Sequence, residues 1–385
     1  MQGRTTRWVG VGLVVLLAGC GSSAKPAAEK PVQIWKRGDV AFGVLAPLSG
    51  DQAARGRDLV DGATFAAEDL NVRGGVLGKR VKLTKLDDGC SAASSRASAK
   101  RLLEEEPAGV VGGVCQSAAR AAARTLDVPF LVTTANSPRI VDVKRTPNAY
   151  LTNGTPYQSA LAAVHFLALQ NTHRLATVST DDRAAKTLAK DVLGLASPAP
   201  QAVSEQTIAA DADLAAVART ALASSPDVVY FAGPAAVSGG LVAALRDAGF
   251  DGTFVASAES EDAEFVSAAG DAAEGAYVIA PAGPQNLPAA AEWAARFEER
   301  FKRAPGRDAM LAYEALRALA QAVTQTGEVD AERNGAELPR LADGYGGFLG
   351  GLRFAADHTV MYDSNIALRV GDGEFQLADT LRSGG

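Results

Sequence analysis

Short apolar segments alternate with longer segments of helical periodicity along most of this chain, and this alternation restricts its fold more than any other feature. The order strand, helix, strand recurs in two consecutive series, one over residues 40–133 and one over residues 156–279. Each such series forms a mainly parallel sheet with helices on its faces, so we predict an α/β fold with two doubly wound parallel-sheet lobes. The expected strands are 40–46, 81–86, 108–114, 129–133, 174–179, 203–207, 227–232, 253–256 and 276–279, and the expected helices are 58–71, 92–105, 117–126, 156–170, 183–193, 214–223, 237–248, 289–302 and 309–326.

The first residues predict export. Arg4 and Arg7 precede a short apolar run at 9–18, and small residues follow, which is the pattern of a signal peptide over 1–19. The run is short for a membrane span. Leu-Ala-Gly before Cys20 resembles the bacterial lipobox, in which the cysteine becomes the lipidated first residue; a signal peptide with an incidental cysteine is the alternative. We expect residues 20–38 to be a lipidated tether that holds an extracytoplasmic protein at the cell membrane.

Charge and length narrow the classes of partner. The chain has 38 basic and 44 acidic residues, so loss of Arg4 and Arg7 leaves 36 basic residues and a net charge of −8. An acidic protein does not track nucleic-acid phosphates, so we expect no nucleic-acid partner. The mature chain is longer than a typical domain with one hydrophobic core, which agrees with two lobes.

Two cysteines remain once Cys20 is assigned to the lipid. Cys90 and Cys115 form an even pair, which in an oxidising compartment favours a disulfide. Two separate buried thiols are the alternative. The chain has no CxxC motif, so neither a zinc ribbon nor a redox motif is indicated.

Polar loops follow several of the expected strands. In parallel sheets the ligand lies beyond the carboxyl ends of the strands, where these loops gather. Gln116 and Ser117 come where a helix begins, and the free N–H groups there favour a carboxylate, although Ser117 as an ordinary helix cap is the alternative. The loops at 133–138 and 49–56 are also polar, and three such loops favour one small polar ligand.

Signatures of enzymes are missing from the sequence. There is no GxGxxG after a strand and no GxSxG, and residues 74–80 lack the spacing of a phosphate loop. His165, His173 and His358 stand apart and form no set with metal-ligand spacing. We therefore expect a protein that is not an enzyme and has neither a metal nor a cofactor.

The chain resembles the type I periplasmic binding proteins, in particular the branched-chain amino-acid-binding (leucine/isoleucine/valine) family of ABC-transporter receptors. The resemblance covers about residues 39–375 and is carried by the order and spacing of several segments, which are 47–50, 69–71, 74–78, 87–90, 112–117, 226–230 and 273–275.

This resemblance implies two lobes that are joined by three crossing strands and close on a ligand like a flytrap. The first lobe is expected to combine 39–152 with 280–360, and the second to combine 153–279 with 361–375, before a C-terminal tail at 376–385. The resemblance also implies that Cys90 and Cys115 form a disulfide.

The ligand residues that the resemblance implies match this chain unevenly. In the first lobe, Gln116 and Ser117 match the loop that grips the carboxylate of the amino acid, and Thr134 and Asn136 match the next binding loop. The other positions depart from the family. Arg183 or Ala184, and the pair 233–234, stand where aromatic residues are expected; Glu259 lies one place from the expected acid, and Arg55 replaces an aromatic residue near the mouth.

Arginine prefers planar anions. These departures therefore favour an organic acid or an amide as the ligand, with an amino acid as the other candidate. We expect a monomeric, lipid-anchored receptor that delivers a small carboxylate-bearing molecule to an ABC permease. The alternative is a ligand sensor that signals to a membrane partner without transport. An enzyme is the third hypothesis, and no nucleophile, metal or cofactor constellation favours it.

Overall fold

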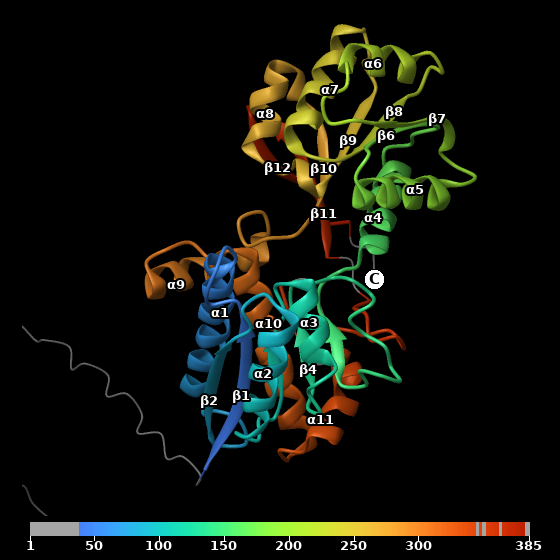
Figure 1. Cartoon of the computed structure of the whole chain (residues 1–385). Helices are drawn as coiled ribbons and strands as arrows, with labels where there is room; N and C mark the ends of the chain where they lie inside the picture. Colours follow the sequence, from blue (N-terminus) through green and yellow to red (C-terminus); the bar gives the residue numbers. More distant parts are fainter. Residues whose placement is uncertain (1–37, 344–345, 349–351, 362–363, 382–385) are drawn as a thin grey trace, which may run out of the picture. The chain divides into compact units, whose positions relative to one another are not determined.

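The computed structural model describes residues 38–343, 346–348, 352–361 and 364–381. The predicted signal peptide, the lipidation site Cys20 and almost the whole tether lie outside the described residues. The described chain forms two β-sheets, each covered by helices (Figure 1). The prediction of an α/β fold with two parallel-sheet lobes is confirmed.

The first sheet has five strands in the order β2-β1-β3-β4-β5, and every neighbouring pair is parallel. The strands are β1 (Asp39–Ala46), β2 (Arg80–Asp87), β3 (Val110–Gly112), β4 (Phe130–Val132) and β5 (Ala149–Leu151). Three helices connect them: α1 (Ala53–Val72), α2 (Ala92–Leu103) and α3 (Gln116–Ala123). Three more helices that come much later in the chain, α9 (Ala291–Phe301), α10 (Arg307–Thr326) and α11 (Ala331–Glu337), complete this lobe (Figure 1).

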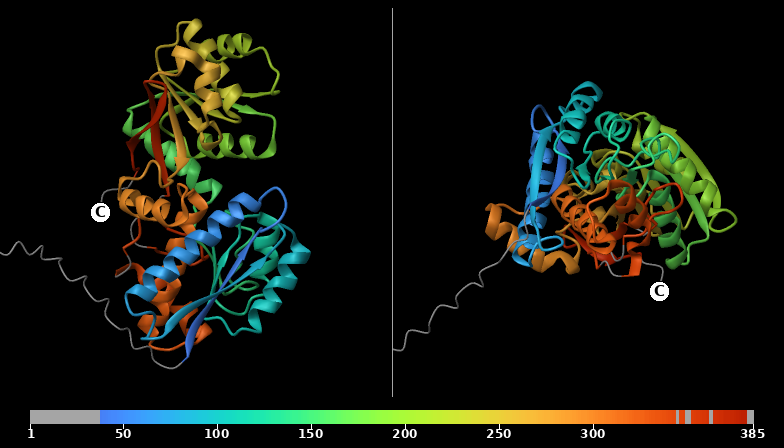
Figure 2. Two further views of the ribbon diagram at one scale, coloured as in Figure 1. Left: turned by 90° about the vertical axis from the view of Figure 1, so that its left-hand side faces the viewer. Right: turned by 90° about the horizontal axis from the view of Figure 1, so that it is seen from below.

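The first sheet is buried on both faces. Along β1, Phe42 and Val44 pack into the core that α1 and α10 share, whereas Leu45 packs into the core beneath α2 and α3. This alternation follows from the two-residue period of a strand. Figure 2 shows helices on both sides of the strands, as a doubly wound sheet requires.

A cluster of aromatic rings attaches the late helices to the first lobe. Phe65 of α1 contacts Trp293 and Phe297 of α9 and Tyr313 of α10, with ring centroids 5.8–6.4 Å apart. Gly62 lets α1 and α10 approach closely, because a side chain there would overlap the carbonyl group of Ala309. Burial of several large rings makes this a strong attachment between distant parts of the chain.

The second sheet has seven strands in the order β12-β11-β10-β9-β8-β6-β7. Five strands are parallel: β6 (Arg174–Thr180), β7 (Gln201–Ile208), β8 (Val228–Ala232), β9 (Thr253–Ser257) and β10 (Tyr277–Pro281). The last two, β11 (Asn365–Gly371) and β12 (Glu374–Asp379), form an antiparallel hairpin at the edge beside β10, which the sequence analysis did not anticipate. The helices of this lobe are α4 (Pro156–Leu169), α5 (Arg183–Ala196), α6 (Leu214–Leu222), α7 (Ala235–Asp247) and α8 (Ala263–Ala269).

Side-chain caps begin four of these helices, including α8, where Asp262 accepts a hydrogen bond from the backbone N–H of Glu264. Thr155 and Gln158 form a reciprocal capping box at the start of α4, and Asp182 and Asp213 accept backbone N–H bonds at the starts of α5 and α6. Such caps stabilise a helix by about 1 kcal/mol each. Among the described residues, no helix has both the length and the apolar character that a membrane span needs.

The chain passes between the two sheets three times: after β5, after β10 and before β11. Four short 3₁₀ helices lie in loops: η1 (Ala258–Ser260), η2 (Gly270–Ala273), η3 (Pro288–Ala290) and η4 (Leu338–Asp343). The second sheet extends to Pro281 and Asp379, past the expected limits at 279 and 375. The proposed lobe boundaries stay a prediction.

Side chains at the start of α10 bind two of these passages. The guanidinium of Arg307 donates to the carbonyl of Ala282, 3.1 Å away, and to the amide oxygen of Asn153, 2.7 Å away. Ala282 directly follows β10, and Asn153 follows β5. One cation therefore holds two separate passages of the chain against the first lobe.

A half-buried carboxyl group lies near this cation. Glu261, in the loop after β9, accepts a hydrogen bond of 3.0 Å from Asn286, which in turn accepts one from the backbone N–H of Gly283. Burial raises the pKa of Glu261 to about 6, although Arg307 and Asn286 act in the opposite direction. The charged form of Glu261 is therefore less favourable in the folded protein than in the unfolded chain.

The disulfide that the resemblance implied is present. Cys90 and Cys115 are joined, with their Cα atoms 5.3 Å apart. Cys90 lies in the loop after β2, and Cys115 is the residue before α3. The bond therefore fastens together two loops at the carboxyl ends of β2 and β3, the strands on either side of β1.

Replacing both bridged cysteines, as Cys90→Ala with Cys115→Ala, should lower the free energy of unfolding by about 3 kcal/mol, because the bond closes a loop with a sequence separation of 25 residues. Urea unfolding of the oxidised protein and of the double variant measures the difference. The reduced parent is the control and should match the double variant. Equal stability of the oxidised parent and the variant would show that the bond contributes nothing.

Glu261→Gln should change how stability depends on pH. The folded-state pKa of Glu261 lies near 6, above its ordinary value of 4.5, so its contribution to stability is fully present below pH 4.5 and is lost as the pH rises through 6. Between pH 4.5 and pH 7.5 the parent should therefore lose about 2 kcal/mol more of its free energy of unfolding than the variant does. Urea unfolding at both pH values measures this, and parallel pH profiles would contradict the assignment.

Candidate functional site

Two of the predicted ligand residues contact each other at the carboxyl edge of the first sheet. Gln116 is the first residue of α3, and its amide nitrogen donates to the side-chain oxygen of Asn136 over 3.0 Å. Its amide oxygen accepts a bond of 3.2 Å from the backbone N–H of Ser137. The loop after β4 is therefore bound to the start of α3, as the convergence of polar loops predicted.

Arg55 and Thr134 meet at a carboxylate that sequence reasoning missed. Asp308, in the first turn of α10, accepts two bonds from the guanidinium of Arg55, of 2.8 and 3.1 Å, and one from the hydroxyl of Thr134. Asp308 is buried, whereas Arg55 is partly exposed. The guanidinium of Arg55 thus already has an anionic partner within the protein, with the bidentate geometry that arginine and carboxylate favour.

The backbone of the same loop is held as well. The amide of Asn153 donates to the carbonyl oxygen of Thr134 over 2.7 Å, and Asn153 is itself bound by Arg307. The first turn of α10 therefore fixes Thr134 by its hydroxyl through Asp308 and by its carbonyl through Asn153. A site built on such a loop is positioned before any ligand arrives.

A pocket of about 300 Å³ lies at the carboxyl ends of the strands of the second sheet. The first lobe contributes Asn136, and the second contributes the starts of α4 and α5 and the residues that follow β8 and β9. Its lining is Asn136, Pro156, Ser159, Ala184, Ala185, Leu188, Tyr230, Gly233, Ser257, Ala258, Glu259 and Ile279. The pocket brings together Asn136 and Glu259, two residues that the sequence analysis assigned to the ligand.

The small residues in this lining replace large ones that the resemblance led us to expect. The resemblance implies aromatic side chains at Arg183 or Ala184 and at 233–234, and of these residues Ala184 and Gly233 line the pocket, where they add little side-chain volume. Leu188, Tyr230 and Ile279 supply apolar surface instead. The pocket therefore combines an apolar wall with a small number of polar groups, as is usual for small-molecule sites.

Glu259 is the carboxylate of the pocket. It lies in η1, directly after β9, and its pKa is raised, mainly because it loses solvent and partly because Asp182 is near. Bonds from the hydroxyl of Thr180 and from two backbone N–H groups of α5 lower the pKa of Asp182. Asp182 therefore stays charged. Its negative charge makes the charged form of Glu259 unfavourable unless a cation binds beside Glu259.

Two other predicted residues lie elsewhere. Ser117 lines a separate hollow beside Arg96, Arg120 and Arg124, and its hydroxyl is 3.4 Å from the carbonyl of Cys90. Arg183 is exposed at the start of α5 and is not among the residues that line the pocket. Their assignment to the ligand stays a prediction.

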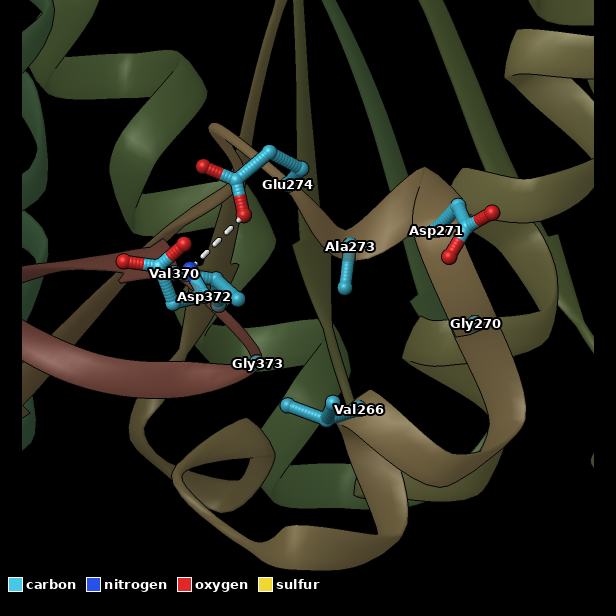
Figure 3. A pocket seen from close by; sticks show the side chains of 8 residues that line it. All are labelled: Val266, Gly270, Asp271, Ala273, Glu274, Val370, Asp372 and Gly373. Carbon is cyan, nitrogen blue, oxygen red and sulfur yellow. Dashed lines mark hydrogen bonds between the residues drawn. The ribbon is translucent and has the colours of Figure 1, made fainter.

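A larger hollow, of about 580 Å³, lies at the opposite edge of the second sheet (Figure 3). Asp271, Glu274 and Asp372 surround it, and Glu274 turns toward the backbone N–H of Asp372, from which it accepts a bond of 3.1 Å. This edge is where β10 begins, whereas ligands of parallel sheets bind where strands end. In the part of the chain that the structure describes, no cluster of three or more His, Cys, Asp or Glu residues is arranged to hold a metal ion.

Comparison with known sequences agrees with this architecture. The "amino acid binding protein" of Pseudomonas aeruginosa is 27% identical over 227 residues, which cover 56% of this chain and 60% of that protein. The "Leu/Ile/Val-binding protein BraC3" of Rhizobium johnstonii is 29% identical over 244 residues, covering 62% and 66% respectively. The chain thus matches about two thirds or less of the length of these two relatives. The leucine-, isoleucine-, valine-, threonine- and alanine-binding protein of P. aeruginosa is 25% identical, with coverage of 76% and 80%.

Solved structures show the same fold. A putative branched-chain amino acid ABC transporter protein from Rhodospirillum rubrum has a TM-score of 0.79 at 22% identity, covering 88% of this chain and 99% of that one. The branched-chain amino acid substrate-binding protein of Streptococcus pneumoniae, in complex with isoleucine, has a TM-score of 0.64 at 20% identity, with coverage of 89% and 100%. A solute-binding protein of an ABC transporter from R. palustris, in complex with benzoate, has a TM-score of 0.62 at 18% identity, with coverage of 90% and 97%.

The chain also matches a whole protein family over most of its length. Residues 39–373 match the family described as periplasmic binding protein, and this range includes the first sheet, the second sheet except β12, and all three passages between them. The parallel sheets, the pocket at their carboxyl edge and the disulfide beside it agree with that match. This chain belongs to the periplasmic binding protein family.

Proposed function

We propose that this protein is the lipid-anchored, extracytoplasmic receptor of an ABC importer and that it binds a small carboxylate-bearing molecule in the 300 Å³ pocket. The observation that carries the proposal is the lining of that pocket, to which the first lobe contributes Asn136 and the second contributes Glu259. A ligand that contacts both favours the arrangement of lobes in which both contacts are made. This is the physical requirement for a receptor that reports its loaded state to a permease.

Amide groups are the proposed receptors for the carboxylate. The guanidinium of Arg55 is already bound to Asp308. The groups at this edge that we propose for the carboxylate are therefore the amides of Gln116 and Asn136 and the backbone N–H groups at the start of α3. The assignment of Ser117 to the same carboxylate belongs to this proposal. Hydrogen bonds from neutral donors hold an anion without a buried cation.

The remainder of the ligand is proposed to be compact and apolar. Leu188, Tyr230 and Ile279 form the apolar wall, and Ala184 and Gly233 leave room for a branched side chain or a ring. Structural relatives hold isoleucine in one case and benzoate in another, and both molecules have this combination of a carboxylate and an apolar group. Glu259 decides between the two chemistries, since only an amino acid brings an ammonium group.

Partners follow from the same proposal. The relatives are named for amino-acid binding and for branched-chain amino acid ABC transport, so we propose an ABC permease as the membrane partner and a monomeric receptor. The anchor is proposed to be lipid on Cys20, outside the described residues. A single acyl chain holds a protein only weakly at a membrane, so more than one chain is expected there.

Glu259→Gln should shift the affinities for leucine and benzoate in opposite directions. Loss of the carboxylate should weaken leucine at least tenfold, because a charge-assisted hydrogen bond contributes about 1.5–3 kcal/mol. The same change should tighten benzoate severalfold, since one repulsion between like charges is removed. Calorimetry with both probes measures this, and Glu205→Gln, on β7 outside the pocket, is the charge-matched control. Unchanged affinity for both probes would place Glu259 outside the ligand's contacts.

Asn136→Ala and Ser117→Ala should each weaken binding of the preferred probe about tenfold, the effect of losing one hydrogen bond to a charged group. Thermal-shift screening of amino acids against aliphatic and aromatic carboxylic acids selects that probe, because a bound ligand raises apparent stability. Ser204→Ala, on β7, is the control. If Asn136→Ala binds as well as the parent, the proposed site is wrong; if only Ser117→Ala does, the carboxylate lies away from that hydroxyl.

A further inference from the structure

Five arginine side chains gather on one surface of the first lobe, although the protein as a whole is acidic. Arg120 and Arg124 extend from α3 and its final turn, Arg96 from the neighbouring α2, and Arg139 and Arg145 from the segment after β4. The helices α2 and α3 pack side by side (Figure 1). This surface is separate from the 300 Å³ pocket, none of whose lining residues is an arginine.

These arginines surround two adjoining hollows. One, of about 390 Å³, is lined by Arg96, Arg120 and Arg124, and the other, of about 200 Å³, by Arg120, Arg124, Arg139 and Arg145. We call the smaller one the arginine pocket. Arg120 and Arg124 stand between the two hollows and line both. At about 30 Å³ for each water, the arginine pocket has room for roughly seven waters, which is the space of a diphosphate rather than of a nucleotide.

Little within the protein neutralises this charge. Asp142 is the one carboxylate in the lining of the arginine pocket, and it pairs with Arg145 over 3.7 Å. Its other oxygen accepts backbone N–H bonds from Lys144 and Arg145. Over the residues that the structure describes, no ion pair or side-chain hydrogen bond engages the guanidinium groups of the remaining four, which are Arg96, Arg120, Arg124 and Arg139.

The pocket has a fixed floor. The hydroxyl of buried Thr146 accepts a bond of 2.7 Å from the backbone N–H of Asp142 and lies 3.3 Å from the carbonyl oxygen of Ile140, to which it donates. Ile140 and Val141 are buried in the core of the lobe. The segment that carries Arg139 and Arg145 is therefore held in place, so these side chains extend from a rigid base.

We infer that the arginine pocket binds a multivalent oxyanion of the phosphate class. Like charges at positions i and i+4 of a helix, such as Arg120 and Arg124, repel each other, and a bound dianion removes that repulsion. The planar fork of arginine matches phosphate oxygens with two parallel N–H bonds, and several forks around one small space select a multivalent anion over a monovalent one. Two sources of this chemistry are a soluble phosphate compound and the phosphate of a lipid headgroup at the membrane that anchors the chain.

Calorimetry with inorganic pyrophosphate tests the inference on the purified full-length protein. The parent should bind pyrophosphate, and Arg120→Gln with Arg124→Gln should weaken that binding at least tenfold. Arg139→Gln, on a different segment, should weaken pyrophosphate binding severalfold. This variant takes the place of the double variant if the double variant fails to fold. The matched control is Arg57→Gln with Arg219→Gln, which removes the same charge from exposed arginines outside the arginine pocket and should alter the affinity less than twofold.

Sedimentation with vesicles distinguishes the two sources. Phosphatidylglycerol vesicles are compared with phosphatidylcholine vesicles for the parent and for both double variants, so that any contribution of the lipid anchor cancels. Pyrophosphate binding that depends on Arg120 and Arg124 supports a soluble phosphate ligand, and a preference for phosphatidylglycerol that depends on them supports a lipid headgroup. Absence of both in the parent, or equal losses in the Arg57/Arg219 control, would overturn the inference.

Discussion

The buried carboxylate of Asp308 is the contact on which the binding edge of the first lobe depends. It lies in the first turn of α10 and is paired with Arg55 from α1 and with Thr134 after β4. A buried carboxylate without partners is strongly unfavourable, so these three segments must meet for the lobe to fold. The adjacent residue, Arg307, holds Asn153, which in turn binds the carbonyl group of Thr134. A helix that comes late in the chain thereby positions a loop that comes early.

The chemistry of the site follows from this junction. Because the guanidinium of Arg55 is bound to Asp308, the cleft edge of the first lobe presents amides rather than a cation. The second lobe presents Glu259 on an otherwise apolar wall, and its pKa is raised mainly by loss of solvent and further by the nearby Asp182. In the proposed complex the ligand therefore meets polarised neutral groups on one side and a single carboxylate on the other, and the disulfide between Cys90 and Cys115 fastens the loop before α3 to the loop after β2.

Much of this fold could be predicted from the sequence because parallel strands are buried on both faces. The continuous apolar run at 227–232 became β8, Val228–Ala232, whose five residues are all buried, and the periodic segment at 309–326 became most of α10. The hairpin of β11 and β12 was missed because β12 is half exposed and no helix separates the two strands. Asp372 and Gly373, both with positive φ, form its turn, and this Asp-Gly pair was the signal that could have revealed it.

Side-chain partners were harder to predict than elements. Arg55 and Asp308 are 253 residues apart, and only the packing of α1 on α10 brings them together. Ser117 lies at the start of α3 and lines the hollow shared with Arg96, a position that depends on how α3 packs against its neighbours; its assignment to the ligand stays a prediction. By contrast, Gln116 and Asn136 were expected to converge because both follow neighbouring parallel strands, and they are in contact.

A crystal structure of the protein with its preferred amino acid or carboxylic acid will show whether one small molecule is held between Asn136 and Glu259. We expect ligand density that contacts the side chain of Asn136 and the apolar surface of Leu188 and Ile279, with the carboxylate toward Gln116. Density for that ligand in the hollow between Asp271, Glu274 and Asp372, or at any place out of contact with Asn136, would contradict it.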